Sequence, residues 1–278
     1  MKYVPHPGLV ARVESGFKRD AGKPELLGNP GYGGRKIEAA MRIAVGMEPG
    51  PLDPVKRHTA AERAFISIPG TVQSIDLDLP KENGIRDLFS KVRPGDEVTF
   101  PSNNVEKCGN VIAVDALRDR AVESAEEACR KVCIRLRPFE NKTREFLFGG
   151  LCDWAPWAFR LADPENLRAY RSMPPAFSDL MEAANSRRVA VLPKLADEPS
   201  TDWHGERIDA AFGKVLNQSG FEAAGFDPIR PFEGAAVGSL FWKAFLRGGV
   251  QGGAWLLDTL VFFASKKSAS AEVMLWLS

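Results

Sequence analysis

Alternation of apolar and polar positions is strongest in the middle of the chain and predicts a group of strands there. The run Thr71–Leu79 alternates in this way, which is typical of a strand with one buried face. Further strands are predicted at Phe65–Ile68, Gly109–Val114 and Cys133–Leu136. A helical period over Arg120–Val132 predicts an amphipathic helix between the last two strands. Together these elements predict a compact antiparallel β unit covered by a helix.

Helical patterns flank this unit on both sides. Upstream, Arg35–Val45 reads as a helix with Ile37, Ala40, Met41 and Ala44 on one side, and Gly46 is its expected C-cap. A short helix is expected at Val55–Glu62. Downstream, helices are predicted at Pro175–Ala184, Arg207–Leu216, Ser239–Leu246 and Ala254–Ala264, with a short strand at Val189–Leu192. The fold class is therefore expected to be α+β, with a mainly helical C-terminal region.

Glycine pairs separate the last two predicted helices. Gly248-Gly249 and Gly252-Gly253 have a small-x-x-x-small spacing, which permits close approach of another element. Because glycine also disfavours a helix interior, we expect tight packing or a helix break here.

Charge and hydropathy narrow the possible partners. The 278 residues include 37 Lys and Arg against 36 Asp and Glu, a net charge of +1, which gives no support for nucleic-acid binding. The start of the chain has no apolar core of signal-peptide length. Gly248–Ala264 is interrupted by Gln251 and Asp258, and it is shorter than the roughly 20 residues that a bilayer span needs. We expect a cytoplasmic protein without a membrane partner.

The spacing of the cysteines does not predict a metal site. Cys129 and Cys133 lie one helical turn apart and could share a metal, but no histidine is near to complete a site, so we interpret them as buried apolar residues. All four cysteines are expected to be reduced. They are Cys108, Cys129, Cys133 and Cys152.

The six tryptophans all follow residue 153, and they indicate either a partner-binding surface or core packing.

One cluster of polar residues could carry catalysis. Asp202-Trp203-His204-Gly205-Glu206-Arg207 would make His204 a general base oriented by a carboxylate. The alternative, which we favour, is a loop that leads into the next helix, with an acid near the helix N-terminus. The sequence contains no Gly-x-Ser-x-Gly, no Walker A loop and no Gly-x-Gly-x-x-Gly fingerprint.

Several short motifs resemble those of a known family. In order along the chain they are Pro69-Gly70-Thr71-Val72, Gly95-Asp96-Glu97-Val98, Gly109-Asn110-Val111-Ile112-Ala113 and Glu127-Ala128. In this order the segment from Arg63 to Pro138 resembles the terminal domain of ATP-grasp carboxylate–amine ligases, particularly the L-amino-acid ligase branch.

A second likeness lies upstream, in Leu27-Gly28-Asn29-Pro30-Gly31-Tyr32-Gly33-Gly34. It is similar to the end of the ATP-grasp catalytic region, but Leu27 stands where the family has its magnesium-binding Glu and Gly31 where it has an Arg. Leucine cannot bind a cation, and phosphoryl transfer needs Mg²⁺ held by hard oxygen ligands. The resemblance implies Asn29 as a ligand of metal and nucleotide. Glu25, two residues before Leu27 on the same strand face, is expected to replace the missing Glu through a register shift, as a metal and nucleotide ligand, and Arg35 to replace the missing Arg at the nucleotide.

The resemblance implies three regions: residues 1–62 as a remnant of the catalytic region, 63–140 as the terminal α+β domain, and 141–278 as a mostly helical, Trp-rich region. Only 28 residues precede Asn29, too few for the family's flap and adenine pocket. The chain is therefore expected to be part of, or descended from, a ligase that joins a carboxylate to an amine through an acyl phosphate. We expect it to be truncated and inactive in isolation. As an active enzyme it would use ATP and Mg²⁺ and need a partner or an upstream region. The alternative is a non-catalytic interaction or scaffold module with a protein partner or a second copy, and a third option is an unrelated hydrolase centred on His204.

Overall fold

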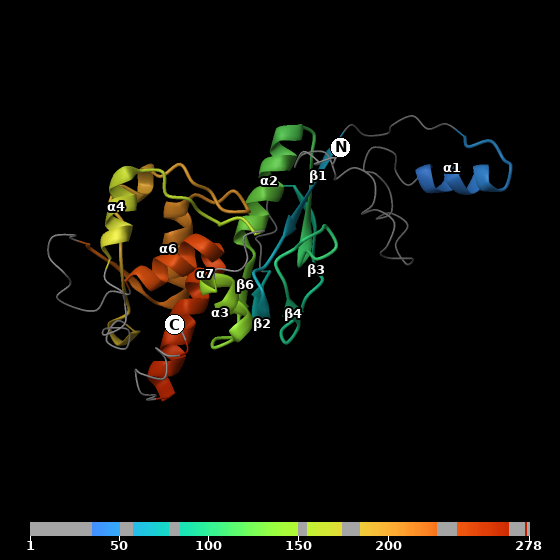
Figure 1. Ribbon diagram of the computed structural model, residues 1–278. Helices are drawn as coiled ribbons and strands as arrows, with labels where there is room; N and C mark the ends of the chain where they lie inside the picture. The colour runs from blue at the N-terminus through green and yellow to red at the C-terminus, as the bar shows by residue number, and fades with distance from the viewer. Residues whose placement is uncertain are drawn as a thin grey trace, which may run out of the picture. The chain divides into compact units, whose positions relative to one another are not determined.

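Three small β-sheets and a long, broken helix account for much of the regular structure in the described residues (Figure 1). The computed structural model describes residues 35–50, 58–77, 84–149, 155–173, 184–226, 238–266 and 276. The chain divides into two compact units, and we describe each by itself. The first comprises residues 1–64, 79–89 and 110–131, and the second comprises 65–78, 90–109 and 132–278.

The first unit is built on a three-stranded sheet with the order β1-β5-β3. Its elements are β1 (Thr59–Phe65), β3 (Ile85–Ser90), β5 (Gly109–Asp115) and α2 (Arg118–Lys131). The core between sheet and helix consists of small side chains, namely Ala61, Ala113, Ala121 and Ala125. Alanines at this interface allow the α2 backbone to pack close to the sheet.

Helix α1 (Arg35–Ala44) also belongs to the first unit, and its C-terminus is closed by the expected glycine. Gly46 has φ of +75°, and the amide of Met47 donates to the carbonyl of Arg42 over 2.8 Å. A left-handed glycine followed by this 6→1 hydrogen bond is a Schellman cap. Ala40, Met41 and Ala44, on the predicted apolar side, are exposed.

The second unit contains an antiparallel sheet with the order β4-β2-β6. Its strands are β2 (Gly70–Asp76), β4 (Glu97–Val98) and β6 (Cys133–Leu136). The register of β2 against β6 shifts between Val72 and Ser74, as at a β-bulge. The inward side chains Val72 and Leu136 are buried and lie opposite each other across the ladder.

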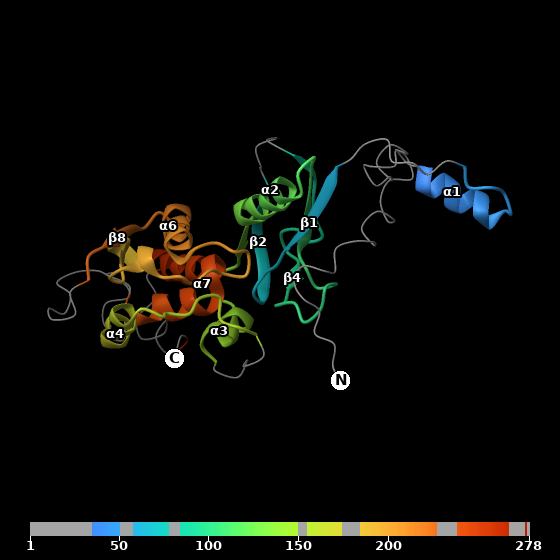
Figure 2. The ribbon, with the colours of Figure 1, turned by 90° about the horizontal axis from the view of Figure 1, so that it is seen from above.

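Helices dominate the remainder of the second unit. They are α3 (Asn141–Phe148), α4 (Pro164–Ser172), α6 (Ile208–Ser219) and α7 (Ser239–Lys266), with a 3-10 turn at Leu195–Asp197. Strand β7 (Arg188–Ala190) pairs in parallel with β8 (Glu222–Ala224). Helices α3 and α6 both pack on α7 (Figure 2). The apolar centre is aromatic: Phe212 stacks on Trp242, and Phe241 stacks on Phe245.

The α+β class is confirmed, with a mainly helical C-terminal region. The predicted helix at Val55–Glu62 is wrong in its described half, because Thr59 to Glu62 form part of β1. The strand predicted at Phe65–Ile68 is also misplaced, since β1 ends at Phe65. The three domain boundaries stay a prediction. Among the described residues, no helix is long and apolar enough to cross a membrane.

Candidate functional site

The residues that the resemblance assigns to ATP and Mg²⁺ are mostly outside the described structure. Glu25 and Asn29 both precede residue 35, as do Leu27 and Gly31. Arg35 is the first residue of α1, and its side chain also lies outside the description. The proposed nucleotide and metal ligands therefore stay a prediction.

The polar cluster at residues 202–207 forms a tight loop at the start of α6. One carboxylate oxygen of Asp202, Oδ1, accepts from the amides of His204 at 2.8 Å and Glu206 at 2.9 Å. The amide of Asp202 in turn donates to the carbonyl of Glu206 over 2.9 Å, and Gly205 takes φ of +75°. Asp202 thus satisfies backbone donors of the loop, as Asp commonly does in turns. The interpretation as a loop leading into a helix is confirmed.

The imidazole of His204 contacts a backbone segment that is remote in sequence. Its Nε2 atom accepts a hydrogen bond from the amide of Ile66 over 3.3 Å. A nitrogen that accepts in this way carries no proton, so the Nε2 lone pair is used inside the fold. That lone pair is the group which a general base would offer to a substrate.

Gln251 of α7 holds the next two residues of the same segment. Its Oε1 accepts from the amide of Ile68 at 3.0 Å, and its Nε2 donates to Oγ of Ser67 at 3.2 Å. Ser67 is fully buried, and its hydroxyl donates to the carbonyl of Ile68 over 2.9 Å. His204 and Gln251 together therefore fix residues 66–68, which lie between β1 and β2. Their side chains make hydrogen bonds to this segment of the kind that a neighbouring strand makes within a sheet.

The glycine pairs of α7 produce both of the effects that the sequence predicts. Gly249 has φ of +61° and ψ of −150°, which interrupts the helix. The carbonyls of Leu246 and Arg247, next to this break, accept from the amides of Phe159 at 2.9 Å and Ala158 at 3.3 Å. A Cβ atom on Gly252 would lie 2.3 Å from the carbonyl oxygen of Ala244, so only glycine fits there.

A buried cation lies beside the break. Arg247 is 5% exposed, its Nη1 donates to the carbonyl of Ala155 over 2.5 Å, and its guanidinium lies 4.6 Å from the ring centre of Phe146. Phe146 stacks on Phe100, which meets the indole of Trp203 edge to face at 4.8 Å. These contacts connect the α7 break to α3 and to the loop that carries His204. The arrangement stabilises the fold through cation–π and aromatic packing.

Cys108 and Cys129 are buried, whereas Cys133, expected to be buried as well, is half-buried at the start of β6. Burial raises the pKa of the Cys108 thiol to about 11 and that of Cys129 to about 12, and it also raises the pKa of Cys133. Thiols with such values are weak nucleophiles and poor metal ligands near neutral pH. Cys152 lies outside the described residues.

Side chains that could bind a metal ion do not cluster among the described residues. Those residues contain no group of three or more His, Cys, Asp or Glu side chains that could hold a metal ion. The magnesium ligands that the resemblance implies, Glu25 and Asn29, lie outside these residues and stay a prediction, and no chemical step is assigned through ATP or Mg²⁺.

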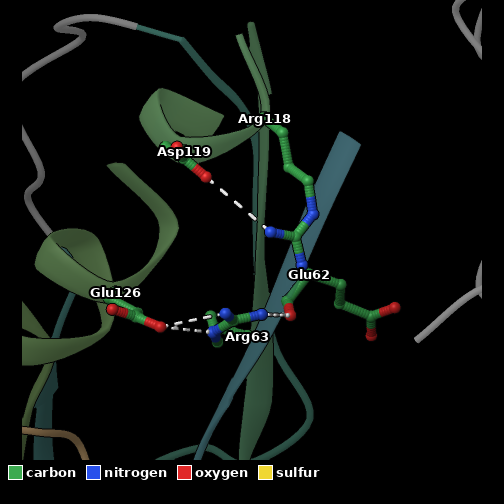
Figure 3. A network of polar contacts seen from close by, with 5 residues as sticks. All are labelled: Glu62, Arg63, Arg118, Asp119 and Glu126. Carbon is green, nitrogen blue, oxygen red and sulfur yellow. Dashed lines mark hydrogen bonds and ion pairs between the residues drawn. The ribbon is translucent and has the colours of Figure 1, made fainter. Parts of the chain in front are cut away.

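The first unit contributes a charged network that joins β1 to α2 (Figure 3). Arg63 donates to Oε1 of Glu126 through Nε at 3.0 Å and Nη2 at 2.9 Å, and to the carbonyl of Glu62 through Nη1 at 3.0 Å. Arg118 pairs with Asp119 at 3.7 Å, but both of these side chains are mostly exposed. The Arg63–Glu126 pair fixes the helix on the sheet, while the Arg118–Asp119 pair adds little in water.

Comparison with known proteins identifies one segment. A family model described as L-amino acid ligase C-terminal domain 2 matches residues 64–137. No curated protein and no solved structure matches the chain. The match runs from the last two residues of β1 through α2 to just past the end of β6. The resemblance drawn from the sequence is confirmed, and residues 64–137 are similar to the second C-terminal domain of L-amino acid ligases.

Proposed function

We propose that the chain is part of, or descended from, an ATP-grasp ligase that joins a carboxylate to an amine through an acyl phosphate. The observation that carries this proposal is the match of residues 64–137 to a ligase C-terminal domain. The matched residues include the strands β2, β3, β4, β5 and β6 and the helix α2. In such a ligase this segment follows the ATP-binding region.

We further propose that the isolated chain does not catalyse ligation. The support lies in the sequence, where Leu27 replaces a magnesium-binding Glu and Gly31 replaces an Arg. Without a carboxylate at the first position, Mg²⁺ loses a hard anionic ligand, and without the guanidinium the phosphate charge loses a partner. ATP and Mg²⁺ would therefore be used only in combination with a second polypeptide region that supplies these groups.

A non-catalytic interaction or scaffold module is the second candidate function. The observation that favours it is the internal use of the groups with catalytic potential. His204 accepts from Ile66, and Asp202 accepts from the amides of His204 and Glu206. These contacts stabilise the second unit instead of presenting polar atoms to a substrate.

A binding titration separates these proposals. The purified chain is titrated with a fluorescent ATP analogue in the presence of Mg²⁺, alone and after addition of a cell extract. We expect a flat titration for the chain alone, and micromolar binding would overturn its inactivity. Binding that appears only with the extract would favour the ligase subunit over the scaffold module.

Variants then show whether any observed binding uses the predicted site. Glu25→Gln and Asn29→Ala should abolish nucleotide binding if these residues hold the Mg²⁺–ATP complex, because both remove oxygen ligands or their charge. Glu222→Gln, in the short strand β8, is the matched control for a change of carboxylate to amide. Equal binding by all three variants would overturn the assignment of Glu25 and Asn29.

A further inference from the structure

Two side-chain acceptors hold residues 66–68, and they differ in how they respond to pH. The amide of Ile66 donates to Nε2 of His204 over 3.3 Å, and the amide of Ile68 donates to Oε1 of Gln251 over 3.0 Å. The carboxamide of Gln251 remains a neutral acceptor, whereas an imidazole gains a proton at mildly acidic pH. The first of these two contacts is therefore sensitive to pH, and the second is not.

Protonation reverses the hydrogen-bonding role of Nε2. A neutral imidazole that accepts at Nε2 carries its single proton on Nδ1. The second proton is bound at Nε2, and both ring nitrogens are then donors. The amide of Ile66 would face another N–H over the same 3.3 Å, which is a repulsive arrangement. An imidazolium at His204 therefore cannot keep the contact that the neutral ring makes.

The positions of these residues make the loss of this contact a local event. His204 is half-buried, so protons from solvent reach its ring without unfolding of the second unit. Ile66 is half-buried as well, whereas Ser67 and Ile68 are fully buried and both are bonded to Gln251. We therefore expect protonation to free the amide of Ile66 and to leave the next two residues in place.

The charged side chains of the loop and of α6 place a negative charge next to His204. These side chains are Asp202, Glu206, Arg207, Asp209 and Lys214. Glu206 pairs with Lys214, and Arg207 pairs with Asp209, so each pair has a formal charge of zero. Oδ1 of Asp202 accepts from the amide of His204 over 2.8 Å, which fixes the remaining carboxylate beside the histidine. This carboxylate gives the imidazolium an ion-pair partner once it leaves Ile66.

The other elements that pack near the loop contribute mainly neutral groups. Residues 66–68 have no charged side chain, and Phe100, which packs against the loop, is apolar. Helix α7 contributes the neutral Gln251 and the cation Arg247, whose guanidinium lies over the ring of Phe146. Since carboxylates ordinarily titrate near about pH 4 and lysine near about pH 10, histidine is the side chain that changes charge between pH 5 and pH 7.5.

We propose that the contact between His204 and Ile66 is a pH-sensitive switch: the neutral ring holds the amide of Ile66, and protonation releases it while Gln251 keeps Ile68 in place. The contribution of the contact is complete well above the ordinary histidine pKa of about 6.5 and is lost as pH falls below that value. The released residue directly follows the end of β1, next to the point where the chain passes from the first compact unit to the second. Acidification thus loosens this connection and leaves α6 and α7 folded.

Amide hydrogen exchange at Ile66 and Ile68 tests the switch within one molecule. The exchange rates of single amides in the full-length chain are measured by NMR at pH 5 and pH 7.5 and corrected for the intrinsic rate at each pH. We expect the protection factor of Ile66 to be about fivefold lower at pH 5, which corresponds to the loss of one ordinary hydrogen bond. The protection factor of Ile68 should differ by less than about twofold, because its acceptor does not titrate.

Two variants assign the effect to His204. His204→Gln provides an acceptor that does not titrate, so the pH dependence of protection at Ile66 should disappear. His58→Gln removes an exposed histidine from β1's flank and is the matched control, in which the pH dependence at Ile66 should be unchanged. If His204→Gln is poorly folded by circular dichroism, the ¹⁵N chemical shift of Nε2 in the unmodified protein is measured instead. It should report a nitrogen without a proton at pH 7.5 and with a proton at pH 5.

Three results overturn the proposal. The first is an equal protection factor of Ile66 at the two pH values in the unmodified chain. The second is a pH dependence at Ile66 that persists in folded His204→Gln. The third is a proton on Nε2 of His204 at pH 7.5, because the ring would then not be the acceptor.

Discussion

His204 accepts a hydrogen bond through Nε2 from the backbone amide of Ile66, which lies 138 residues earlier in the chain. This contact ties the α6 loop to the segment that leads into β2, and Gln251 ties α7 to the same segment. The segment belongs to the part of the chain that matches the ligase domain, whereas His204 and Gln251 belong to the helical region that follows it. The helical region therefore stabilises the matched domain through side-chain acceptors.

We expect His204→Ala to destabilise the second unit because it leaves the amide of Ile66 without this acceptor. The loss should be about 1–2 kcal/mol of unfolding free energy, measured by urea denaturation. His204→Gln should retain part of this stability, since an amide oxygen can accept in place of Nε2. His58→Ala, at an exposed histidine, is the control and should change stability little. Equal stability of His204→Ala and the unmodified chain would contradict a structural role for this bond.

Two glycine-to-alanine substitutions in the helices are expected to change the free energy of unfolding in opposite directions. Gly252→Ala would bring a Cβ to 2.3 Å from the carbonyl oxygen of Ala244, which is backbone and cannot rotate away. We expect a loss of about 1–3 kcal/mol or more. Gly213→Ala, inside α6, meets no heavy atom within 4 Å and should gain about 0.5–1 kcal/mol from helix propensity. Thermal denaturation of the two variants measures both effects, and a stabilised Gly252→Ala would refute the close packing at the α7 break.

The sequence predicts well those strands and helices whose own residues carry the propensity for that structure. Gly109–Val114 and Cys133–Leu136 are short, mainly apolar runs rich in β-branched residues, and both are strands in the structure. The prediction of a helix at Val55–Glu62 is wrong at Thr59–Glu62, which form part of β1. Ala60, Ala61 and Glu62 favour helices, while their strand conformation depends on pairing with β5. Tertiary pairing overrides local propensity there.

The sequence predicts the contacts of a candidate site only where the contacting residues are neighbours in sequence. The position of Asp202 before a helix predicts that it belongs to a loop leading into that helix. The structure confirms this, and the Asp202 carboxylate accepts a hydrogen bond from the amide of Glu206 in this loop. The bond from Ile66 to His204 and the contacts of Trp276 with Phe139 and Trp255 join residues that are distant in sequence. No local period carries information about such pairs, so they appear only with the fold.

The buried cysteines should resist alkylation while the protein is folded. Raising the thiol pKa of Cys108 from 9.0 to about 11 lowers its thiolate fraction near pH 8 by about a hundredfold, and the reaction requires the thiolate. We expect iodoacetamide to label Cys108 and Cys129 slowly in buffer and rapidly in urea, as followed by mass spectrometry of the peptides. Rapid labelling of either residue in the folded chain would contradict its burial.

The same pKa values predict how stability depends on pH. Since the folded state holds these thiol protons more tightly than the unfolded state, their contribution is complete below the ordinary cysteine pKa and is lost as pH rises from about 9 towards about 11–12. The variant Cys108→Ser/Cys129→Ser should show a shallower loss of stability across this range. Urea denaturation at pH 8, 9 and 10 measures the difference, and parallel pH profiles would contradict the prediction.

The described tryptophans include both core and surface residues, and substitution should separate the two kinds by their effect on stability. Trp242 is fully buried, stacks on Phe212 at 5.2 Å and donates from Nε1 to the carbonyl of Ala190 over 2.9 Å. Trp242→Ala should therefore cost about 3–5 kcal/mol, because it opens a large cavity and leaves that carbonyl without its donor. Trp242→Phe should cost less, since it keeps a stacked ring. Trp157, which is 43% exposed, is the matched control, and Trp157→Ala should leave the urea midpoint nearly unchanged. A larger loss at Trp157 than at Trp242 would mean that the exposed tryptophan, and not the helical core, holds the second unit together.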